Sequence, residues 1–327
     1  MDSRVVTTRK YNEIDYTRFV LICLVILVHI VNFSTLYPQA QQFINLFFMQ
    51  AFLLITGYLM NVNKRIREFA SYLLKIFLPY AIMLLGYAYI STILPVRDGI
   101  DSFTISHVLR VLFVKPIGPY WYFHTMMICA TLYYIANRCA KKYGQAAVFC
   151  LTTSLYVLVA STSLIAYSHA LFFLLGIGIK LLRLKWEELF KPTLWSVVPF
   201  ALCAGCYADG KGNVLAVFIL VGAFLSFIPK MTGVIRSPRC QKYMGFVGRN
   251  TLPIYLFHPI FTMGAKYLLP LFRFDPSGIL HIIVTITMGV AGSLLIAYIM
   301  DKTHLSFCFG RKSILRFPKA YTTSIAC

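Results

Sequence analysis

The stretch TRFVLICLVILVHIVNFSTL (residues 17–36), closely followed by QFINLFFMQAFLLITGYLM (residues 42–60), decides the fold of this chain. Each run has about 20 predominantly apolar residues, the length that an α-helix needs to cross about 30 Å of hydrocarbon. Further runs of this kind continue along the sequence, at residues 72–94, 118–137, 145–161, 164–180, 193–208, 214–229, 251–270 and 279–300. The sequence therefore predicts an all-α, polytopic membrane helical bundle of about ten transmembrane helices.

The overall composition also indicates a membrane protein. Hydrophobic residues make up 59% of the 327 residues and charged residues only 13%, and the mean hydropathy is +0.72. A soluble chain of this length could not cover its surface with so few charged side chains. We therefore expect no sizeable soluble domain, and we expect the lipid bilayer to surround most of the chain.

The net charge of +20 would suit a nucleic-acid-binding protein, but the positions of the basic residues indicate membrane topology instead. Most Lys and Arg residues lie in the two terminal segments and in every second connection between the apolar runs. The intervening connections hold only Arg97, Arg110, Lys115, Lys211 and Arg273. Because Lys and Arg accumulate in cytoplasmic connections, we predict both termini in the cytoplasm, an even number of spans and no nucleic-acid partner.

This topology divides the chain into three parts. We predict a basic cytoplasmic segment at residues 1–16, a transmembrane domain of ten helices at residues 17–300 and a basic cytoplasmic tail at residues 301–327. The first apolar run lacks a cleavage site of small residues, so we expect it to remain in the protein. We expect the tail to lie at or near the membrane surface.

Three ionisable side chains at the first span are the leading functional candidates, because membranes penalise such groups. At about 100° per residue, Arg18 and His29 return to within about 20° of one helix face, and Asp15 lies on the same side. The step from Arg18 to His29 is about 16 Å, which places the imidazole near mid-membrane. The i, i+3 spacing lets Asp15 pair with Arg18. A structural alternative stays open, in which Arg18 extends to the membrane surface and His29 bonds a neighbouring helix.

A second polar group lies in the ninth predicted span. Thr251, Tyr255 and His258 recur at i, i+4 and i+7, so they share one helix face. Pro253 and Pro259 weaken the backbone hydrogen bonding of this helix. We therefore expect a bend or an unwound turn here, of the kind that lines a cavity.

The fourth predicted span begins with Tyr120, Trp121 and Tyr122, followed by His124, and enters from the outer side. Of these residues, Tyr120, Trp121 and His124 are candidates for substrate binding. An aromatic belt at the membrane interface is the alternative for the three aromatic side chains. For His169 in the sixth span we favour a structural role.

In combination, these elements resemble acyltransferase family three, whose integral-membrane members acylate extracytoplasmic sugars, glycolipids and some small molecules. Asp15, Arg18 and His29 match the family's opening pattern. Three further elements follow in the family's order, at residues 47–59, 119–123 and 248–258. The spacing from Arg18 to His29 and the Tyr-x-x-His-Pro sequence that ends at Pro259 are the more discriminating features.

The resemblance implies a reaction and its substrates. It implies acetyl-coenzyme A, or another acyl-coenzyme A, as the cytoplasmic donor, and a hydroxyl of an extracytoplasmic sugar or glycolipid as the acceptor, in a bacterial inner membrane. A neutral histidine can remove the proton of the attacking hydroxyl, so we expect His29 to be the general base. Arg18, oriented by Asp15, is expected to bind a phosphate or pantetheine oxygen of the donor. We expect no metal.

The remaining candidates are assigned to substrate binding. We expect His258 and Tyr255 to position a substrate or to stabilise the thioester oxygen, and Trp121, Tyr120 and His124 to contribute to the same function. A transporter of a small solute or glycolipid is the main alternative, although the sequence shows no inverted repeat. A non-catalytic membrane assembly protein is the third possibility, and it gives His29 no defined role.

Overall fold

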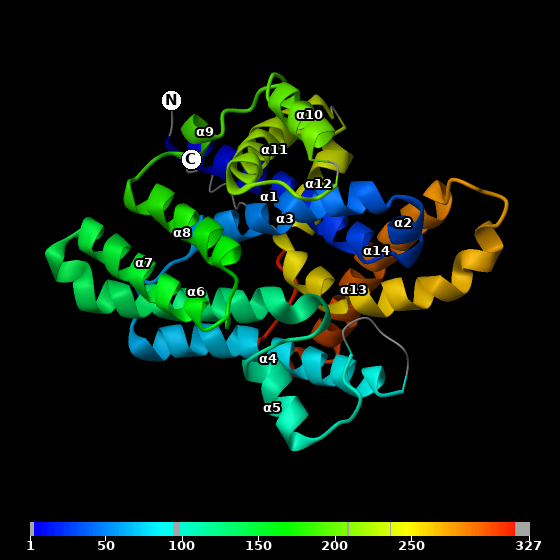
Figure 1. Cartoon of the computed structure of the whole chain (residues 1–327), viewed down its shortest axis with the longest axis horizontal. Coiled ribbons are helices and arrows are strands. Elements are labelled where there is room, and N and C mark those ends of the chain that lie inside the picture. Colours follow the sequence, from blue (N-terminus) through cyan, green and yellow to red (C-terminus); the bar gives the residue numbers. More distant parts are fainter. Residues whose placement is uncertain (1–2, 94–98, 208, 236, 318–327) are drawn as a thin grey trace, which may run out of the picture.

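A computed structural model describes residues 3–93, 99–207, 209–235 and 237–317. The structure is 79% helical, and the described residues contain no strand. Figure 1 shows the helices packed side by side, with α6 (Trp121–Ala140), α7 (Gln145–Ser161) and α8 (Tyr167–Leu181) adjacent at one end. The prediction of an all-α fold is confirmed.

Four helices are long and apolar enough to cross a membrane. They are α3 (Pro38–Leu59), α4 (Ile66–Ser91), α11 (Val214–Val234) and α14 (Ile279–Lys302). In the described part of the chain, each of the ten predicted ranges contains a helix. The other six are α1 (Ser3–Val28), α6, α7, α8, α10 (Val197–Cys206) and α13 (Thr251–Ala265). The structure thus supports a membrane helical bundle, and the count of ten crossings stays a prediction.

The outer sides of the apolar helices are exposed. Ile66, Leu74 and Ile82 on α4 and Ile283 and Leu295 on α14 are exposed hydrophobic side chains. Large apolar surfaces of this kind are rare on soluble monomers and are expected where lipid chains take the place of water.

Short elements connect the longer helices. Within the described ranges these connecting elements are α2 (Val31–Leu36), α5 (Ile105–Phe113), η1 (Gly118–Tyr120), η2 (Lys141–Tyr143), α9 (Trp186–Leu189), α12 (Pro238–Arg249), η3 (Lys266–Phe272) and η4 (Leu305–Phe309). Helix α5 lies in the connection of residues 95–117, which the charge pattern predicts on the outer side, and α12 lies in the connection of residues 230–250, which it predicts on the cytoplasmic side. The predicted boundary at residue 16 is not a structural break, because α1 continues through it.

Two glycines bring α3 and α8 into backbone contact. A Cβ added at Gly57 would lie 2.1 Å from the carbonyl oxygen of Phe173, and one added at Gly176 would lie 2.1 Å from that of Leu54. Only glycine allows this separation, since any side chain would push the helices apart. The crossing fixes the position of α3, which forms one wall of the site described below.

The first predicted span is two helices rather than one. Helix α1 ends at Val28 and α2 begins at Val31, so the prediction of a continuous helix over residues 17–36 is wrong. The break is stabilised locally, because Gln41 Nε2 donates a hydrogen bond to the carbonyl oxygen of Val28 at 2.9 Å. His29 therefore lies at the end of α1, with an exposed side chain, and not inside a helix.

Candidate active site

A cavity of about 300 Å³ lies among α1, α3, α4, α6 and α13. Its apolar walls include Phe52, Ile55, Phe123 and Met126, and its polar lining includes Arg18, Thr56, Lys64, Tyr122, Thr251, Tyr255, Arg311 and Arg316. An apolar pocket with a few polar groups is the usual form of a small-molecule site. Of the residues predicted from the sequence to form a site, Arg18 and Tyr255 lie on this cavity.

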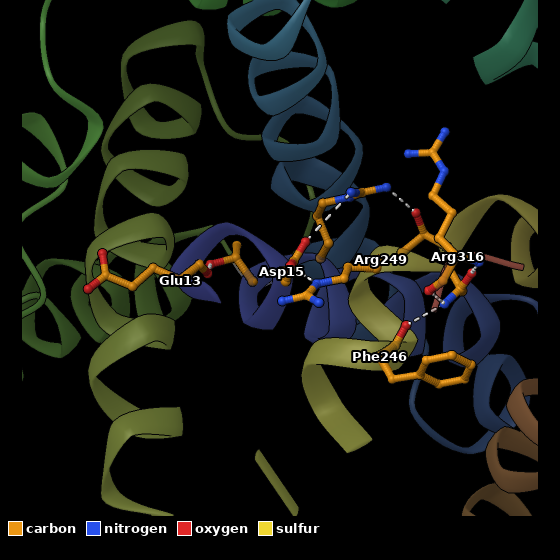
Figure 2. Close-up of polar contacts among 9 residues, drawn as sticks. Glu13, Asp15, Phe246, Arg249 and Arg316 are labelled. Carbon is orange, nitrogen blue, oxygen red and sulfur yellow. Dashed lines mark hydrogen bonds and ion pairs between the residues drawn. The ribbon is translucent and has the colours of Figure 1, made fainter. Parts of the chain in front are cut away.

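Asp15 and Arg249 form the closest ion pair beside the cavity. Arg249 Nε donates to Asp15 Oδ2 at 2.7 Å, whereas Arg18 Nη1 lies 4.0 Å from Asp15 Oδ1. Figure 2 shows Asp15 on α1 and Arg249 on α12 pointing toward one another. Asp15 is buried, so the ion pair limits the cost of removing its charge from water. We expected Asp15 to orient Arg18, and the structure gives Arg249 the shorter contact.

A glycine makes this ion pair possible. Gly248 packs so closely on α1 that an added Cβ would lie 1.8 Å from the carbonyl oxygen of Asp15. Arg249 is the next residue, and the contact between the two backbones places its side chain beside the carboxylate of Asp15. The late glycine of the sequence pattern therefore has a defined structural role in joining α12 to α1.

Arg18 is directed into the protein. Its Nη2 donates to Thr251 Oγ1 at 2.6 Å, and its side chain is 23% exposed. Arg18 thus joins α1 to the first residue of α13 and lines the cavity. This geometry differs from the alternative in which Arg18 extends to the membrane surface.

The helix break near α13 does not lie at Pro253 or Pro259, the residues on which its prediction was based. The helix is continuous from Thr251 to Ala265, and the break lies at Asn250, between α12 and α13. Pro253 is the third residue of α13, where a backbone N–H has no helical partner to lose. An unwound turn at the prolines is therefore wrong, because the break lies at Asn250, next to Thr251 on the cavity. The alternative of a bend in the helix stays a prediction.

Two tyrosines, Tyr122 and Tyr255, line the cavity and contact one another. The hydroxyl of Tyr122 lies 2.6 Å from Thr56 Oγ1, and the rings of Tyr122 and Tyr255 have centroids 5.3 Å apart. The hydroxyl of Tyr255 donates to the carbonyl oxygen of Pro119 at 2.5 Å. Tyr255 is thus a wall of the cavity, and its hydroxyl already has an acceptor.

His29 and His258 face one another beyond these tyrosines. Their ring centroids are 5.2 Å apart in an edge-to-face arrangement, and the ring of His258 is 5.8 Å from that of Tyr255. Neither histidine lines the cavity. The rings of Tyr255 and His258 thus form a chain of contacts from the cavity to His29.

The hydrogen bonds of the two imidazoles define their tautomers. His29 Nδ1 lies 2.6 Å from the carbonyl oxygen of Val25, and His258 Nδ1 lies 3.1 and 2.9 Å from those of Ile254 and Tyr255. A nitrogen beside a carbonyl oxygen must carry the proton, so each neutral ring has its lone pair on Nε2. His258 Nε2 is buried and has no hydrogen-bond partner in the described part of the chain.

The aromatic residues at the start of α6 make structural contacts. The Tyr120 hydroxyl donates to the carbonyl oxygen of Leu256 at 3.1 Å, and His124 Nε2 bonds that of Phe113 at 2.9 Å. Trp121 stacks on His169 with ring centroids 4.3 Å apart. Tyr120, Trp121 and His124 do not line the cavity, and Tyr120 joins the start of α6 to α13 through Leu256.

The sequence interpretation missed several residues of the site. Arg249 directly follows the glycine of the late motif, and this position was the available signal. Thr56 and Tyr122 lie within the motif-bearing runs 47–59 and 119–123 but carry no charge to mark them. Arg311 and Arg316 lie outside every motif, so their place on the cavity follows only from the tertiary fold.

Comparison with known proteins identifies the family. A model of acyltransferase family three, described as an acyltransferase domain, matches residues 11–298. The chain belongs to this family. It is therefore an enzyme that transfers acyl groups, and its apolar helices make it a membrane protein. The family match includes α1 and α13 with their site residues, and ends before Asp301. No curated protein and no solved structure matches the chain.

Proposed function

We propose that this acyltransferase moves an acetyl group from cytoplasmic acetyl-coenzyme A to a hydroxyl of a sugar or glycolipid on the outer side of a bacterial inner membrane. One observation carries the proposal. Helix α1 holds Arg18 on a cavity and His29 beside a second imidazole about 16 Å further along, so one helix joins a basic ligand pocket to a proton acceptor.

The cavity suits the thioester arm of the donor. Ligand pockets usually measure about 300–1,000 Å³, so a cavity of about 300 Å³ suits a slender group and not a whole nucleotide. Phe52, Ile55 and Met126 supply apolar contact for the pantetheine chain. The guanidinium of Arg18, fixed by Thr251, binds an oxygen of the donor.

The reaction itself requires a proton acceptor. In the proposed step the acceptor hydroxyl attacks the thioester carbon, His29 Nε2 takes the hydroxyl proton, and the C–S bond breaks. The proton then passes to the departing thiolate, which leaves as free coenzyme A. Histidine suits this role because its pKa lies close to neutral pH. His258, whose ring contacts that of His29, is assigned to position the hydroxyl by accepting a hydrogen bond on Nε2.

The structure sets one condition on this reaction. Tyr122 and Tyr255 line the cavity, and neither histidine does. We therefore infer that a tyrosine side chain moves when the donor enters, so that the thioester can reach His29. Because the hydroxyl of Tyr255 is bonded to Pro119, we assign Tyr255 to the wall and not to stabilisation of the thioester oxygen.

Acetyl transfer in inverted membrane vesicles from the native host tests the proposal. The vesicles receive acetyl-coenzyme A labelled in the acetyl group, and label is measured in membrane glycolipid and polysaccharide. We expect wild-type vesicles to incorporate label and His29→Ala vesicles to lose at least 100-fold of the rate. His107→Ala is the matched control, because His107 lies on α5 and bonds Ser102 outside the cavity. Full transfer by inserted His29→Ala protein would refute the mechanism.

A further inference from the structure

The segment after α14 folds back onto the protein around a single carboxylate. Asp301 accepts four hydrogen bonds, from the hydroxyls of Ser306 and Ser313 at 2.5 and 2.8 Å and from the backbone N–H groups of Ile314 and Leu315 at 2.7 and 3.0 Å. The Ile314 and Leu315 side chains are buried. Residues 303–317, here called the tail segment, are therefore a packed part of the fold.

A second anchor joins the tail segment to the break between α12 and α13. The Arg316 N–H donates to Asn250 Oδ1 at 2.7 Å, and Asn250 Nδ2 donates to the carbonyl oxygen of Arg316 at 3.1 Å. Figure 2 shows Arg316 beside Asp15 and Arg249 at this junction. Because Asn250 is fully buried, this reciprocal pair holds the backbone of Arg316 in one position.

These anchors place two guanidinium groups on the cavity. Arg311 and Arg316 line it together with Lys64 and Arg18. The Arg311 guanidinium donates to the carbonyl oxygen of Lys75. Lys75 lines a second hollow, which also includes Lys64. Arg311 thus stands between the main cavity and a basic hollow beside it.

The cavity lining holds four basic residues and, among the described residues, no carboxylate; we call the part formed by Lys64, Arg311 and Arg316 its basic mouth. Among the described ion pairs, none joins a carboxylate to Lys64, Arg311 or Arg316. Burial and the charge of Arg316 lower the pKa of Arg311 below its usual value. Like charges held together by a rigid backbone are stabilised when an anion binds between them.

We propose that the tail segment is a wall of the donor site, and that Arg311 and Arg316 bind phosphate oxygens of coenzyme A. This inference rests on the proposed donor. The cavity accommodates the thioester arm and not the nucleotide, so the phosphates of a bound donor lie at the basic mouth. Arginine is suited to this contact, since its planar fork of N–H donors matches two phosphate oxygens.

Binding of coenzyme A to the full-length protein in phosphatidylcholine nanodiscs tests the inference. We expect Arg311→Gln and Arg316→Gln each to raise the Kd for coenzyme A about tenfold. Lys312→Gln is the matched control, because it removes the same charge from an exposed residue of the tail segment that does not line the cavity. We expect its Kd to equal that of wild type. Arg311→Lys keeps the charge and should fall between wild type and Arg311→Gln.

A second donor separates phosphate binding from loss of structure. Acetyl-pantetheine carries the thioester without phosphates, so its transfer rate in vesicles should be the same for wild type and both glutamine variants. Equal losses with both donors, or unchanged Kd values in the variants, would overturn the inference. If wild type binds coenzyme A and the variants bind it equally well, only the role of the tail segment fails. If wild type does not bind coenzyme A, the proposed function fails as well.

Discussion

Two parts of helix α1 differ in how their polar groups are paired: the stretch around Asp15 and Arg18, here called the Arg18 end, and the C-terminal end at His29, here called the His29 end. At the Arg18 end, side chains from distant parts of the chain bond one another directly, as Arg18 bonds Thr251 and Asp15 bonds Arg249. At the His29 end, Nδ1 of His29 and Nδ1 of His258 each lie beside a carbonyl oxygen of their own helix, and His258 Nε2 is buried without a partner in the described structure. We therefore expect the Arg18 end to contribute more to the free energy of unfolding than the His29 end. At the His29 end, the unpartnered nitrogen of His258 lowers stability but leaves a lone pair that can bind a substrate.

The largest expected effect tests the backbone contact that builds the Arg18 end. Replacing Gly248 by alanine places a Cβ 1.8 Å from the carbonyl oxygen of Asp15, so α1 and α12 must separate. We expect a loss of about 3–4 kcal/mol of unfolding free energy, measured as the thermal midpoint in detergent. Gly245→Ala is the matched control one turn earlier, because its Cβ would meet only Tyr16 at an ordinary 3.7 Å. It should be neutral or slightly stabilising, and equal losses in both variants would contradict this account.

The next effect concerns the buried carboxylate. Asp15→Asn keeps an amide oxygen that can accept from Arg249 but removes the negative charge that faces its guanidinium. Breaking a buried pair costs about 3–5 kcal/mol. Since the Arg249 side chain is 34% exposed, we expect a smaller loss of about 2–3 kcal/mol.

A double-mutant cycle with Arg249→Gln measures how far the two residues depend on each other. We expect the double variant to be less destabilised than the sum of the two single variants, by about 1–2 kcal/mol. Additive losses would show that the contact contributes no coupling energy.

At the His29 end, we expect a substitution to lower the rate of acetyl transfer without lowering stability. His258→Phe removes the buried lone pair and keeps a planar ring of similar shape. Because an unpartnered buried acceptor costs about 1–3 kcal/mol, we expect an equal or higher thermal midpoint together with a 10- to 100-fold loss of acetyl transfer. A lower midpoint with normal transfer would reverse the comparison between the two ends.

The sequence predicts local features well and long-range contacts poorly. Apolar runs predict the helices, because each must bury its backbone polar groups internally. The same pattern cannot show where the helix of residues 17–36 breaks, since that break depends on a hydrogen bond from Gln41. Likewise, Asp15, Arg18 and Tyr255 were found from their positions in motifs. The contact of Asp15 with Arg249, 234 residues away, and the place of Arg316 on the cavity are properties of the tertiary fold.

The smallest effect would sharpen the assignment of Arg18 to donor binding. Thr251→Val removes the hydroxyl that accepts from Arg18 Nη2 at 2.6 Å and changes little else in shape. The guanidinium then loses its fixed orientation while keeping its charge. We expect the KM for acetyl-coenzyme A to rise about fivefold, with kcat nearly unchanged, because a lost orienting bond affects donor binding by about 1 kcal/mol.

Thr262→Val is the control for this substitution. Thr262 lies on the same helix and is also buried, but its hydroxyl donates to the carbonyl oxygen of Pro259 and it does not line the cavity. We expect normal kinetics from this variant. If Thr251→Val lowered kcat and left KM unchanged, Arg18 would act on the reacting atoms and not on donor binding. The functional division between the two ends of α1 would then be incorrect.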